Sequence, residues 1–484
     1  MTSDLLVSLG AILPLIILVG WACVLLLVDL FIPQERKGLT ALLAAIGLLV
    51  AVGFVVPRFG RPVAGFSGMV VVDDFSNFLS LLLLLSGLAG IALSYDYLKR
   101  ISVAHGEYYV LLMFSITGML LMSMSADLIV TFLALELLSI PLYVLAGIAV
   151  PRLSSEEAAI KYFLLGAFSS GFFVYGTALV YGASGSTSLQ KILAAVQSGA
   201  YSPVLLLAGA GLLLVGLGFK VAVVPFHMWT PDVYHGAPSA VTAFMAVGAK
   251  AAGFAALLRI FVLAFPAISV NITPVLWGLA ALTMILGNFV AIAQKNIKRL
   301  LAYSSIAHAG YILMALVPYG QSNVSANSVA SALFYLVAYA FTNFAAWAVV
   351  IALEKAEERG LELDDYAGLG RKYPALAAVM TVAMLSFTGV PPTLGFVGKF
   401  FLFRTVVEGG YIGLALIGVL TSLVSAYYYL RVVVVMYMRE GEPEVRQELW
   451  LQLTAFVAAL GVVLLSIFSS PLLNLATLAA LKLF

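Results

Sequence analysis

The sequence PALAAVMTVAMLSFTGVPPTLGFVGKFFLFRTVVE, residues 374–408, is apolar and too long for one simple membrane-spanning helix. A glycine and two consecutive prolines interrupt it between Gly389 and Pro392. Proline removes a backbone donor and clashes with the preceding turn, so the helix must break there. Inside a membrane the freed backbone groups need a polar or protein-lined interior. The stretch therefore predicts a broken membrane helix within a larger helical protein, with Lys399 just beyond the break.

The composition of the whole chain agrees with this reading. Of 484 residues, 63% are hydrophobic and only 10% are charged, whereas soluble domains carry about 25% charged residues. The net charge of +2, without any basic cluster, argues against a nucleic-acid partner. The first apolar run lacks a basic flank, so we expect a retained helix and not a cleaved signal. The chain is predicted to be an all-α, multi-pass membrane protein in contact with the lipid bilayer.

The same sequence excludes several kinds of chemistry. Its single cysteine, Cys23, cannot form a disulfide within the chain or a cysteine-ligated cluster, and we expect it to be an inert core thiol. No Rossmann glycine pattern or P-loop occurs, so hydride transfer and nucleotide hydrolysis are not expected in this chain. No spacing of histidines, cysteines and carboxylates resembles a metal site. We therefore predict no cofactor and no metal in the chain itself.

Apolar runs of membrane-spanning length recur about fourteen times. They lie near residues 5–30, 39–57, 77–96, 107–125, 127–149, 158–182, 203–225, 239–263, 273–293, 300–317, 328–353, 374–408, 411–438 and 449–468. Loops after odd-numbered spans hold fifteen basic residues: Arg36, Lys37, Lys99, Arg100, Arg152, Lys161, Lys295, Lys298, Arg299, Lys355, Arg359, Arg371, Lys372, Arg439 and Arg446. The opposite side holds five: Arg58, Arg61, Lys191, Arg404 and Lys482. The positive-inside rule then places both termini outside, on the periplasmic side.

An internal repeat is visible at an offset of 166 residues. Ser139-Ile140 matches Ser305-Ile306, and Pro225 matches Pro391. The repeats would begin five spans apart, so they would have opposite orientations and each would contain a broken helix, the seventh or the twelfth. We expect an N-terminal three-helix segment (1–106), two inverted five-helix repeats (107–264 and 265–440) and a C-terminal helix (441–484). A chance match of a few residues is the alternative.

Three lysines interrupt long apolar runs: Lys220, Lys250 and Lys399. A cation near mid-bilayer costs roughly 2.5–3.5 kcal/mol on insertion scales, so it indicates an ion or proton pathway. Near a broken helix, exposed carbonyl groups can solvate the ammonium, and burial penalises its charged form enough for proton exchange. Lys220 and Lys399 could instead extend toward the nearer membrane surface, and Lys250 could belong to a static ion pair.

Glu136 is the one acid at comparable depth, nine residues into the fifth span. Paired with a lysine it would stay charged and keep that lysine protonated, so moving the pair apart would release a proton. A structural ion pair is the alternative. Further candidates for the proton path are His308, Tyr303, Tyr335 and Tyr339, which could bridge the lysines through water, and His227 and His235, which could gate an inner half-channel. Histidines and tyrosines in membrane helices are more often packing residues, and loop histidines are usually incidental, so this is the alternative for each.

The remaining charged residues are expected to be peripheral. Asp127 should begin a helix and Arg259 should anchor the outer membrane interface. Residues 354–365 and 439–448 should be solvated loops, and residues 187–199 should form an amphipathic helix along the outer surface.

Four segments resemble a known family. They are LELLSIPLY (135–143), KYFLLGAFSS (161–170), VPFHMWTPDVY (224–234) and KRLLAYSSIAH (298–308). They resemble subunit N of respiratory complex I, over most of the chain. The resemblance implies an antiporter-like fold of fourteen helices, with Glu136 paired with Lys220 and a polar axis continuing through Lys250 and Lys399. The sister subunit M carries glutamate at the position of Lys399, and subunit L has a long C-terminal lateral helix for which this chain has no room.

The resemblance also implies a function. The chain would be a proton-translocating membrane-arm subunit of a bacterial NADH:quinone oxidoreductase, in the inner membrane, with other membrane-arm subunits as partners. Quinone, NADH, flavin and iron–sulfur clusters would be bound by partner subunits. Two alternatives stay open: a subunit of a multisubunit sodium/proton antiporter, and a non-pumping structural scaffold.

Overall fold

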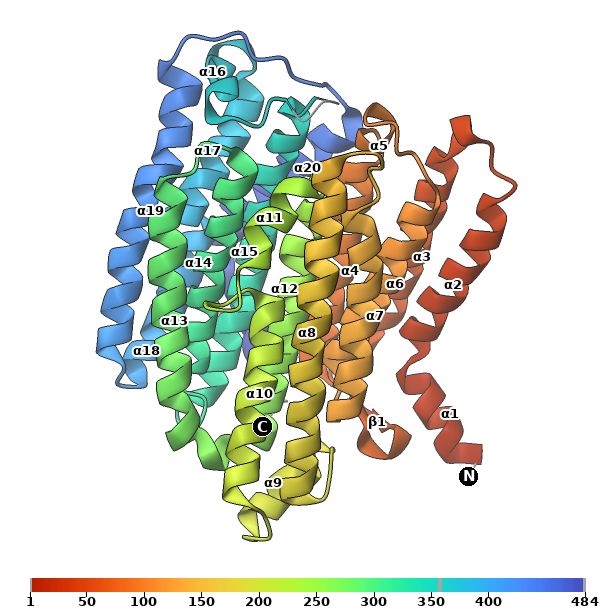
Figure 1. Ribbon diagram of the computed structural model, residues 1–484, viewed down its shortest axis with the longest axis vertical. Helices are drawn as coiled ribbons and strands as arrows, with labels where there is room; N and C mark the ends of the chain where they lie inside the picture. Colours follow the sequence, from red (N-terminus) through yellow and green to blue (C-terminus); the bar gives the residue numbers. More distant parts are fainter. Residues whose placement is uncertain (1, 356–358, 482–484) are drawn as a thin grey trace.

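The computed structural model describes residues 2–355 and 359–481, and it is almost entirely α-helical (Figure 1). Lys482 lies outside the described residues. Within these ranges the one sheet is a small antiparallel pair, β1 (Val63–Gly65) and β2 (Val70–Val72). The expected all-α membrane fold is confirmed.

Eleven helices in the described part of the chain are long and apolar enough to cross a membrane. They are α3 (Gly38–Val55), α4 (Asp74–Ser94), α6 (Glu107–Met124), α7 (Leu128–Ala146), α8 (Leu153–Ser184), α10 (Pro203–Val221), α12 (Ser239–Ala264), α13 (Ser269–Ile292), α15 (Ser325–Leu353), α19 (Ile412–Met438) and α20 (Leu449–Ile467). The bent pair α1 (Thr2–Ala11) and α2 (Leu13–Asp29) makes a twelfth if it is counted as one broken span. The expected fourteen follow if α14 (Ile297–Leu316) and the pair α17 (Pro374–Thr388) and α18 (Leu394–Glu408) are counted too, since these pack along α13, α15 and α19.

Short elements connect the long helices. The α-helical ones are α5 (Tyr97–Arg100), α9 (Leu189–Gln197), α11 (Trp229–Gly236), α16 (Leu369–Lys372) and α21 (Ser469–Leu481). The 3₁₀ turns are η1 (Gln34–Arg36), η2 (Val56–Arg58), η3 (Phe66–Gly68), η4 (Pro266–Ile268) and η5 (Leu363–Tyr366). The amphipathic helix expected at 187–199 is confirmed as α9, which buries Leu189, Ile192 and Val196.

The first predicted span differs from expectation. It is bent by 66° between α1 and α2 and is not one continuous helix. Pro14 stands in the first turn of α2, where its missing N–H costs no helical bond, and its ring prevents the preceding turn from continuing.

Two helices break near the middle of the bundle. After α10 the chain takes a left-handed turn at Ala222 (φ 63°) and resumes as α11. After α17 it turns at Gly389 (φ 89°), and α18 begins after Thr393, whose hydroxyl accepts from the N–H of Phe396. A positive φ is disfavoured for residues with a side chain, so glycine suits the second break, although Ala222 adopts this conformation at the first. The break predicted for 389–392 is confirmed.

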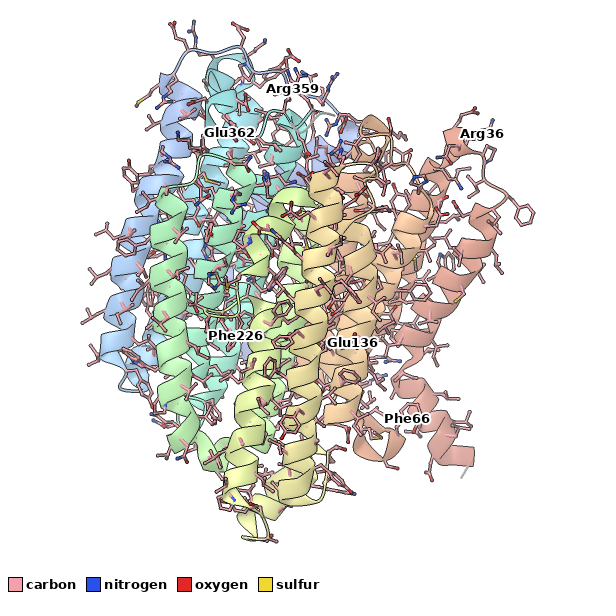
Figure 2. The ribbon with its side chains drawn as sticks, viewed as in Figure 1. Arg36, Phe66, Glu136, Phe226, Arg359 and Glu362 are labelled. Atoms are coloured by element: carbon pink, nitrogen blue, oxygen red, sulfur yellow. The ribbon has the colours of Figure 1, made fainter. Side chains whose placement is uncertain are left out.

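Helices α12 and α15 lie at the centre of the bundle, with nearly all their side chains buried. Helices α3, α8, α13, α19 and α20 lie around them and expose many large apolar side chains, as lipid-facing or partner-facing helices do. Figure 1 shows α5 and α16 at one end of the bundle and α9, β1 and the N-terminus at the other. Figure 2 places Arg36 and Arg359 at the first end and Phe66 at the second, so we refer to the first as the basic end.

Candidate functional site

The three lysines are buried, with exposed fractions of 4% for Lys220 and 3% for both Lys250 and Lys399. Each ammonium donates hydrogen bonds to acceptors inside the bundle. None of the three therefore extends to a membrane surface, and Lys250 forms no salt bridge with any described residue. These acceptors are needed because burying a cation without a polar partner has a large cost in free energy.

Lys220 lies in the last turn of α10 and contacts two hydroxyl groups. Its Nζ donates to Ser139 Oγ at 2.9 Å and to Tyr162 OH at 3.1 Å. Tyr162 is fixed by stacking on Trp229 of α11, with ring centroids 4.6 Å apart. Helices α7, α8 and α11 thus build the Lys220 site together.

Glu136 stands one turn before Ser139 on α7 and is half-buried at mid-height of the bundle (Figure 2). Its Oε1 accepts a short hydrogen bond from Ser170 of α8. The direct ion pair with Lys220 that the resemblance implied is not formed; the Lys220 ammonium donates to Ser139 and Tyr162, and Glu136 bonds to Ser170. The carboxylate is still near enough to act on Lys220 through space.

Lys250 lies on the central helix α12, and backbone carbonyls surround its ammonium. Nζ donates to Val221 O at 3.1 Å and to Ser305 O at 3.0 Å. Val221 is the last residue of α10, where the break leaves carbonyls without helical partners. We expected the carbonyls freed at this break to solvate Lys220, but one of them, that of Val221, accepts from Lys250.

Lys399 follows the second break and reaches back to its carbonyls. Its Nζ donates to Phe387 O at 2.8 Å, to Thr388 O at 3.0 Å and to Ser422 Oγ at 2.6 Å. The two carbonyls belong to the C-terminal end of α17, which carries the negative end of the helix dipole. The ammonium also lies 4.7 Å from the centroid of the Tyr311 ring.

Hydrogen-bonded side chains lie between Lys250 and Lys399. His308 of α14 contacts Tyr335 OH through Nδ1 at 2.6 Å and Tyr429 OH through Nε2 at 3.1 Å. Tyr339 donates to Ser305 Oγ at 2.9 Å, and the carbonyl of Ser305 accepts from Lys250. A histidine between hydroxyl groups can pass a proton by exchanging donor and acceptor roles at its two nitrogens. The structure thus brings His308, Tyr335 and Tyr339 together with two of the lysines.

The other candidates lie apart from this network. Tyr303 is half-buried and packs against apolar neighbours, with no hydrogen bond to the described residues. His227 stands in the segment between α10 and α11, and its Nδ1 is buried without a hydrogen-bond partner in the described part of the chain. His235 lies farther along α11, half-buried, toward the basic end.

Sequence reasoning missed the acceptors Ser139, Tyr162, Ser422 and Tyr429. Ser139 stands out in the sequence only as part of the repeat, although it lies three residues from Glu136 and hence on the same helix face. Tyr162 and Tyr429 come from helices distant in sequence, and no local pattern indicates that they meet a lysine or His308.

Arg259 is not an interface anchor. It is buried and forms a bidentate pair with Asp73, at 3.0 Å (Nη1–Oδ2) and 2.8 Å (Nη2–Oδ1). Its Nε also donates to Ser123 O at 3.1 Å. Asp73 caps α4, so this pair ties α12 to the start of α4. Asp127 caps α7 by accepting from Ile129 N, as expected.

Two further expectations were wrong. Cys23 is exposed on α2 and is not a core thiol. Glu354 is buried at the end of α15 and is not part of a solvated loop. Among the described residues, no group of three or more histidines, cysteines and carboxylates could hold a metal ion.

Residues 125–425 match the transmembrane family described as NADH:quinone oxidoreductase/Mrp antiporter. The NADH-quinone oxidoreductase subunit N of Trichlorobacter lovleyi is 49% identical over 453 residues, which cover 93% of this chain and 91% of that protein. The subunit N of Chloroflexus aggregans is 47% identical over 475 residues, covering 97% of this chain and 96% of that protein.

Solved structures show the same fold. A chain of respiratory complex I from Thermus thermophilus, with bound aureothin, is 38% identical, with a TM-score of 0.83 over 96% of this chain and 99% of that chain. A chain of the Mrp complex from Dietzia sp. has 21% identity and a TM-score of 0.81, covering 100% of this chain and 98% of that chain. At that identity the second likeness shows the fold alone.

Proposed function

The chain belongs to the subunit N family of NADH-quinone oxidoreductases, and on this premise we propose that its buried lysines carry protons across the membrane. It is a multi-pass subunit of the membrane arm of a redox-driven proton translocase in a bacterial inner membrane, with other membrane-arm subunits as partners. The proposal concerns which residues move the proton and how.

One observation supports the proposal most directly: three buried ammonium groups lie at or between two broken helices, and a histidine with its hydroxyl neighbours lies between two of them. Lys220, Lys250 and Lys399 would be the groups that take and release protons. His308, Tyr335 and Tyr339 would connect the last two. Glu136 would control Lys220 through its electric field, because the two groups are close but are not bonded.

The energy must come from outside this chain. Moving one proton against 100 mV costs about 2.3 kcal/mol, and the sequence contains no motif that binds a redox cofactor or a nucleotide. Quinone, NADH, flavin and iron–sulfur clusters would belong to partner subunits. Their redox reaction would perturb Glu136 and Lys220, and the displaced charge would move along the axis so that a proton leaves on the outer side.

The two broken helices support the proposed division of the chain. Residues 107–264 would form one five-helix repeat around the α10–α11 break, and residues 265–440 an inverted repeat around the α17–α18 break. Residues 1–106 and 441–484 would flank them. Inverted repeats place sites near the midplane, which is where an alternating proton path needs its charged groups.

The proposed roles can be tested by removing one charge at a time from the complete complex. Lys220→Met and Glu136→Gln should each reduce NADH-driven proton uptake by inverted membrane vesicles several-fold while the complex still assembles. Lys191→Met is the matched control, because Lys191 is exposed on α9, and it should pump normally. Normal pumping by well-assembled Lys220→Met and Glu136→Gln complexes would show that these residues are structural and that the chain is a scaffold.

A sodium/proton antiporter remains the rival reading of the same fold. The likeness to the Mrp complex is 21% and shows the fold alone, whereas subunit N relatives reach 49%. Replacing sodium by potassium in the vesicle assay separates the two, because redox-driven proton pumping does not require sodium.

A further inference from the structure

Glu354 is a buried acid that the proposed proton axis does not use. It directly follows α15 at the basic end of the bundle, and only 1% of its surface is exposed. Its Oε1 accepts a hydrogen bond from Tyr97 OH at 3.0 Å, and its Oε2 has no hydrogen-bond partner within the described residues. A buried carboxylate oxygen without a donor is costly, so this arrangement needs a reason.

The same region contains other buried polar atoms without partners. Among the described residues, the hydroxyls of Ser239, Thr230 and Tyr366 are buried and form no hydrogen bond. They come from α12, α11 and η5, and Tyr366 is near enough to Glu354 to interact with it electrostatically. Buried polar groups that the protein leaves unpaired are usually satisfied by ordered water. A hydrated site at the basic end is therefore indicated by four side chains from four elements.

Polar groups lie in the direction from this site toward Lys250. Tyr97 OH accepts from the N–H of Ser239, the first residue of α12, at 3.0 Å. Lys250 lies on the same helix, about 16 Å farther along the axis at 1.5 Å per residue. Within that distance the Tyr234 hydroxyl lies near Ser305, whose carbonyl accepts from the Lys250 ammonium. Thr230 and Tyr234 are four residues apart on α11 and so share one face.

Charged groups around Glu354 do not neutralise it. Arg100 is turned to other acceptors, with Nη2 donating to Ile351 O at 2.7 Å and Nη1 lying 3.3 Å from Glu448. Lys298 is buried and donates to Ala237 O at 2.7 Å. Arg152 lies near Tyr97. In the described part of the chain no salt bridge to Glu354 is present, and its Oε2 stays free to bond to water.

We propose that Glu354, with Tyr97, Tyr366 and Ser239, forms the proton-uptake site that supplies Lys250 from the basic face. The positive-inside rule assigns this face to the cytoplasm. The ligands are a proton and the water molecules that deliver it. The inference rests on the proposed role of Lys250 and adds the route by which that lysine is recharged.

The test uses the whole complex in inverted vesicles, whose outer medium contacts the cytoplasmic face. Glu354→Gln keeps the size of the side chain and its acceptor for Tyr97 but cannot carry a proton. Positioned proton-transfer groups contribute roughly 10²–10⁴-fold, so NADH-driven pumping should fall by about tenfold or more. Adding formate to the medium should restore part of the rate, because a small weak acid can enter a hydrated site and deliver protons. Glu440→Gln, an exposed acid at the same end, is the matched control and should pump normally without formate.

A structural role for Glu354 predicts different results. Its loss would then lower the amount of assembled complex, and formate would restore nothing. Tyr97→Phe provides a second variant if Glu354→Gln assembles poorly, and it should also slow pumping in a formate-sensitive manner. If both variants pump normally while Lys250→Met does not, the uptake site is wrong and the lysine axis stands. If Lys250→Met also pumps normally, the proposed axis itself is wrong.

Discussion

At the scale of single residues, the three lysines differ in what accepts their hydrogen bonds. Lys220 contacts two side-chain hydroxyls, Lys250 two backbone carbonyls, and Lys399 two carbonyls and one hydroxyl. A hydroxyl can be removed by one substitution, whereas a carbonyl cannot. The lysines should therefore differ in their sensitivity to mutation.

Ser139→Ala should impair pumping more than Ser422→Ala. The first leaves Lys220 with Tyr162 alone, and the second leaves Lys399 with two carbonyls. Leaving one buried N–H donor of the ammonium without its acceptor costs about 1–3 kcal/mol, so the Ser139 variant should lose several-fold in proton uptake by vesicles. Equal effects of the two substitutions would show that the acceptors do not set the behaviour of the lysines.

Arg259→Met should destabilise the complex strongly. Removing one partner of a buried ion pair costs about 3–5 kcal/mol, because the other charge is left uncompensated. The double variant with Asp73→Asn should recover much of this loss, since asparagine is neutral and still caps α4. The thermal midpoint of the purified complex is the measurement. A double variant no more stable than Arg259→Met would contradict this account.

The sequence was sufficient to find these lysines, because a cation in an apolar run is conspicuous by itself. It could not show that Glu136 bonds to Ser170 and not to Lys220, since that depends on how α7 and α8 are rotated. It also placed Arg259 at the surface, because its partner Asp73 lies on a distant helix. The sequence thus indicated that these lysines lie inside the bundle, but it did not indicate which groups they contact.

At the scale of helices, the α17–α18 break depends on one glycine. A Cβ at Gly389 would lie 2.9 Å from Cδ of Lys399, so the substitution would push the lysine away from its carbonyls. Ala222 adopts the same left-handed conformation at the other break, which shows that backbone strain alone is tolerable there. The close approach to Lys399 is what requires glycine.

Gly389→Ala should therefore lower pumping, and Gly410→Ala should not. Gly410 also has a positive φ of 82°, but a Cβ added there would meet no atom within 4 Å, so the two variants share only the backbone cost. That cost is about 1–2 kcal/mol for a left-handed residue. Vesicle pumping normalised to the amount of assembled complex separates the two effects. A pumping defect of similar size in both variants would place the cause in the backbone and not in Lys399.

The breaks were predictable as positions, because glycine and double proline specify the second locally and Pro225 marks the first. The contacts that the freed backbone groups make could not be predicted from the sequence. The freed carbonyl of Val221 contacts a lysine on another helix, α12, and this contact depends on how α10 packs against α12.

At the scale of the whole molecule, the segment 439–448 crosses the basic end from α19 to α20 (Figure 1). Ion pairs hold it: Lys372 with Glu442 and Lys355 with Glu444, both at 2.9 Å, and Arg439 with Asp364 at 2.6 Å. These pairs are exposed, so each contributes little alone. Together they keep two distant helices connected across the surface.

The segment should loosen in acid. Hydrogen bonds from the lysines lower the pKa values of Glu442 and Glu444 below their usual value of 4.5. A lowered pKa stabilises the folded arrangement above the ordinary value, and this stabilisation is lost as pH falls through the lowered one. Hydrogen exchange of residues 439–448, corrected for intrinsic rates, should therefore accelerate below about pH 4.5. The variant Lys372→Gln/Lys355→Gln should show the faster exchange already at pH 7; unchanged exchange in that variant would contradict the role of the ion pairs.

The overall helix arrangement was largely predictable, because length and hydropathy determine which segments can cross a membrane. The bend between α1 and α2 was not foreseen, although Pro14 lies inside the predicted span 5–30, where proline breaks a helix. The burial of Glu354 was also missed, because an acidic stretch resembles a solvated loop until the surrounding helices are in place.

The two ends of the proposed axis differ in what stabilises the lysine. The carbonyls that hold Lys399 are permanent dipoles at the end of α17, and no titration can remove them. The field at Lys220 comes in part from Glu136, a side chain whose charge a single substitution removes. In the proposed relay, the electrostatic surroundings of Lys220 could change with the charge of Glu136, whereas those of Lys399 are fixed by backbone dipoles. The charge state of Lys220 should therefore respond to substitution of Glu136, whereas no side-chain substitution can remove the carbonyls that hold Lys399.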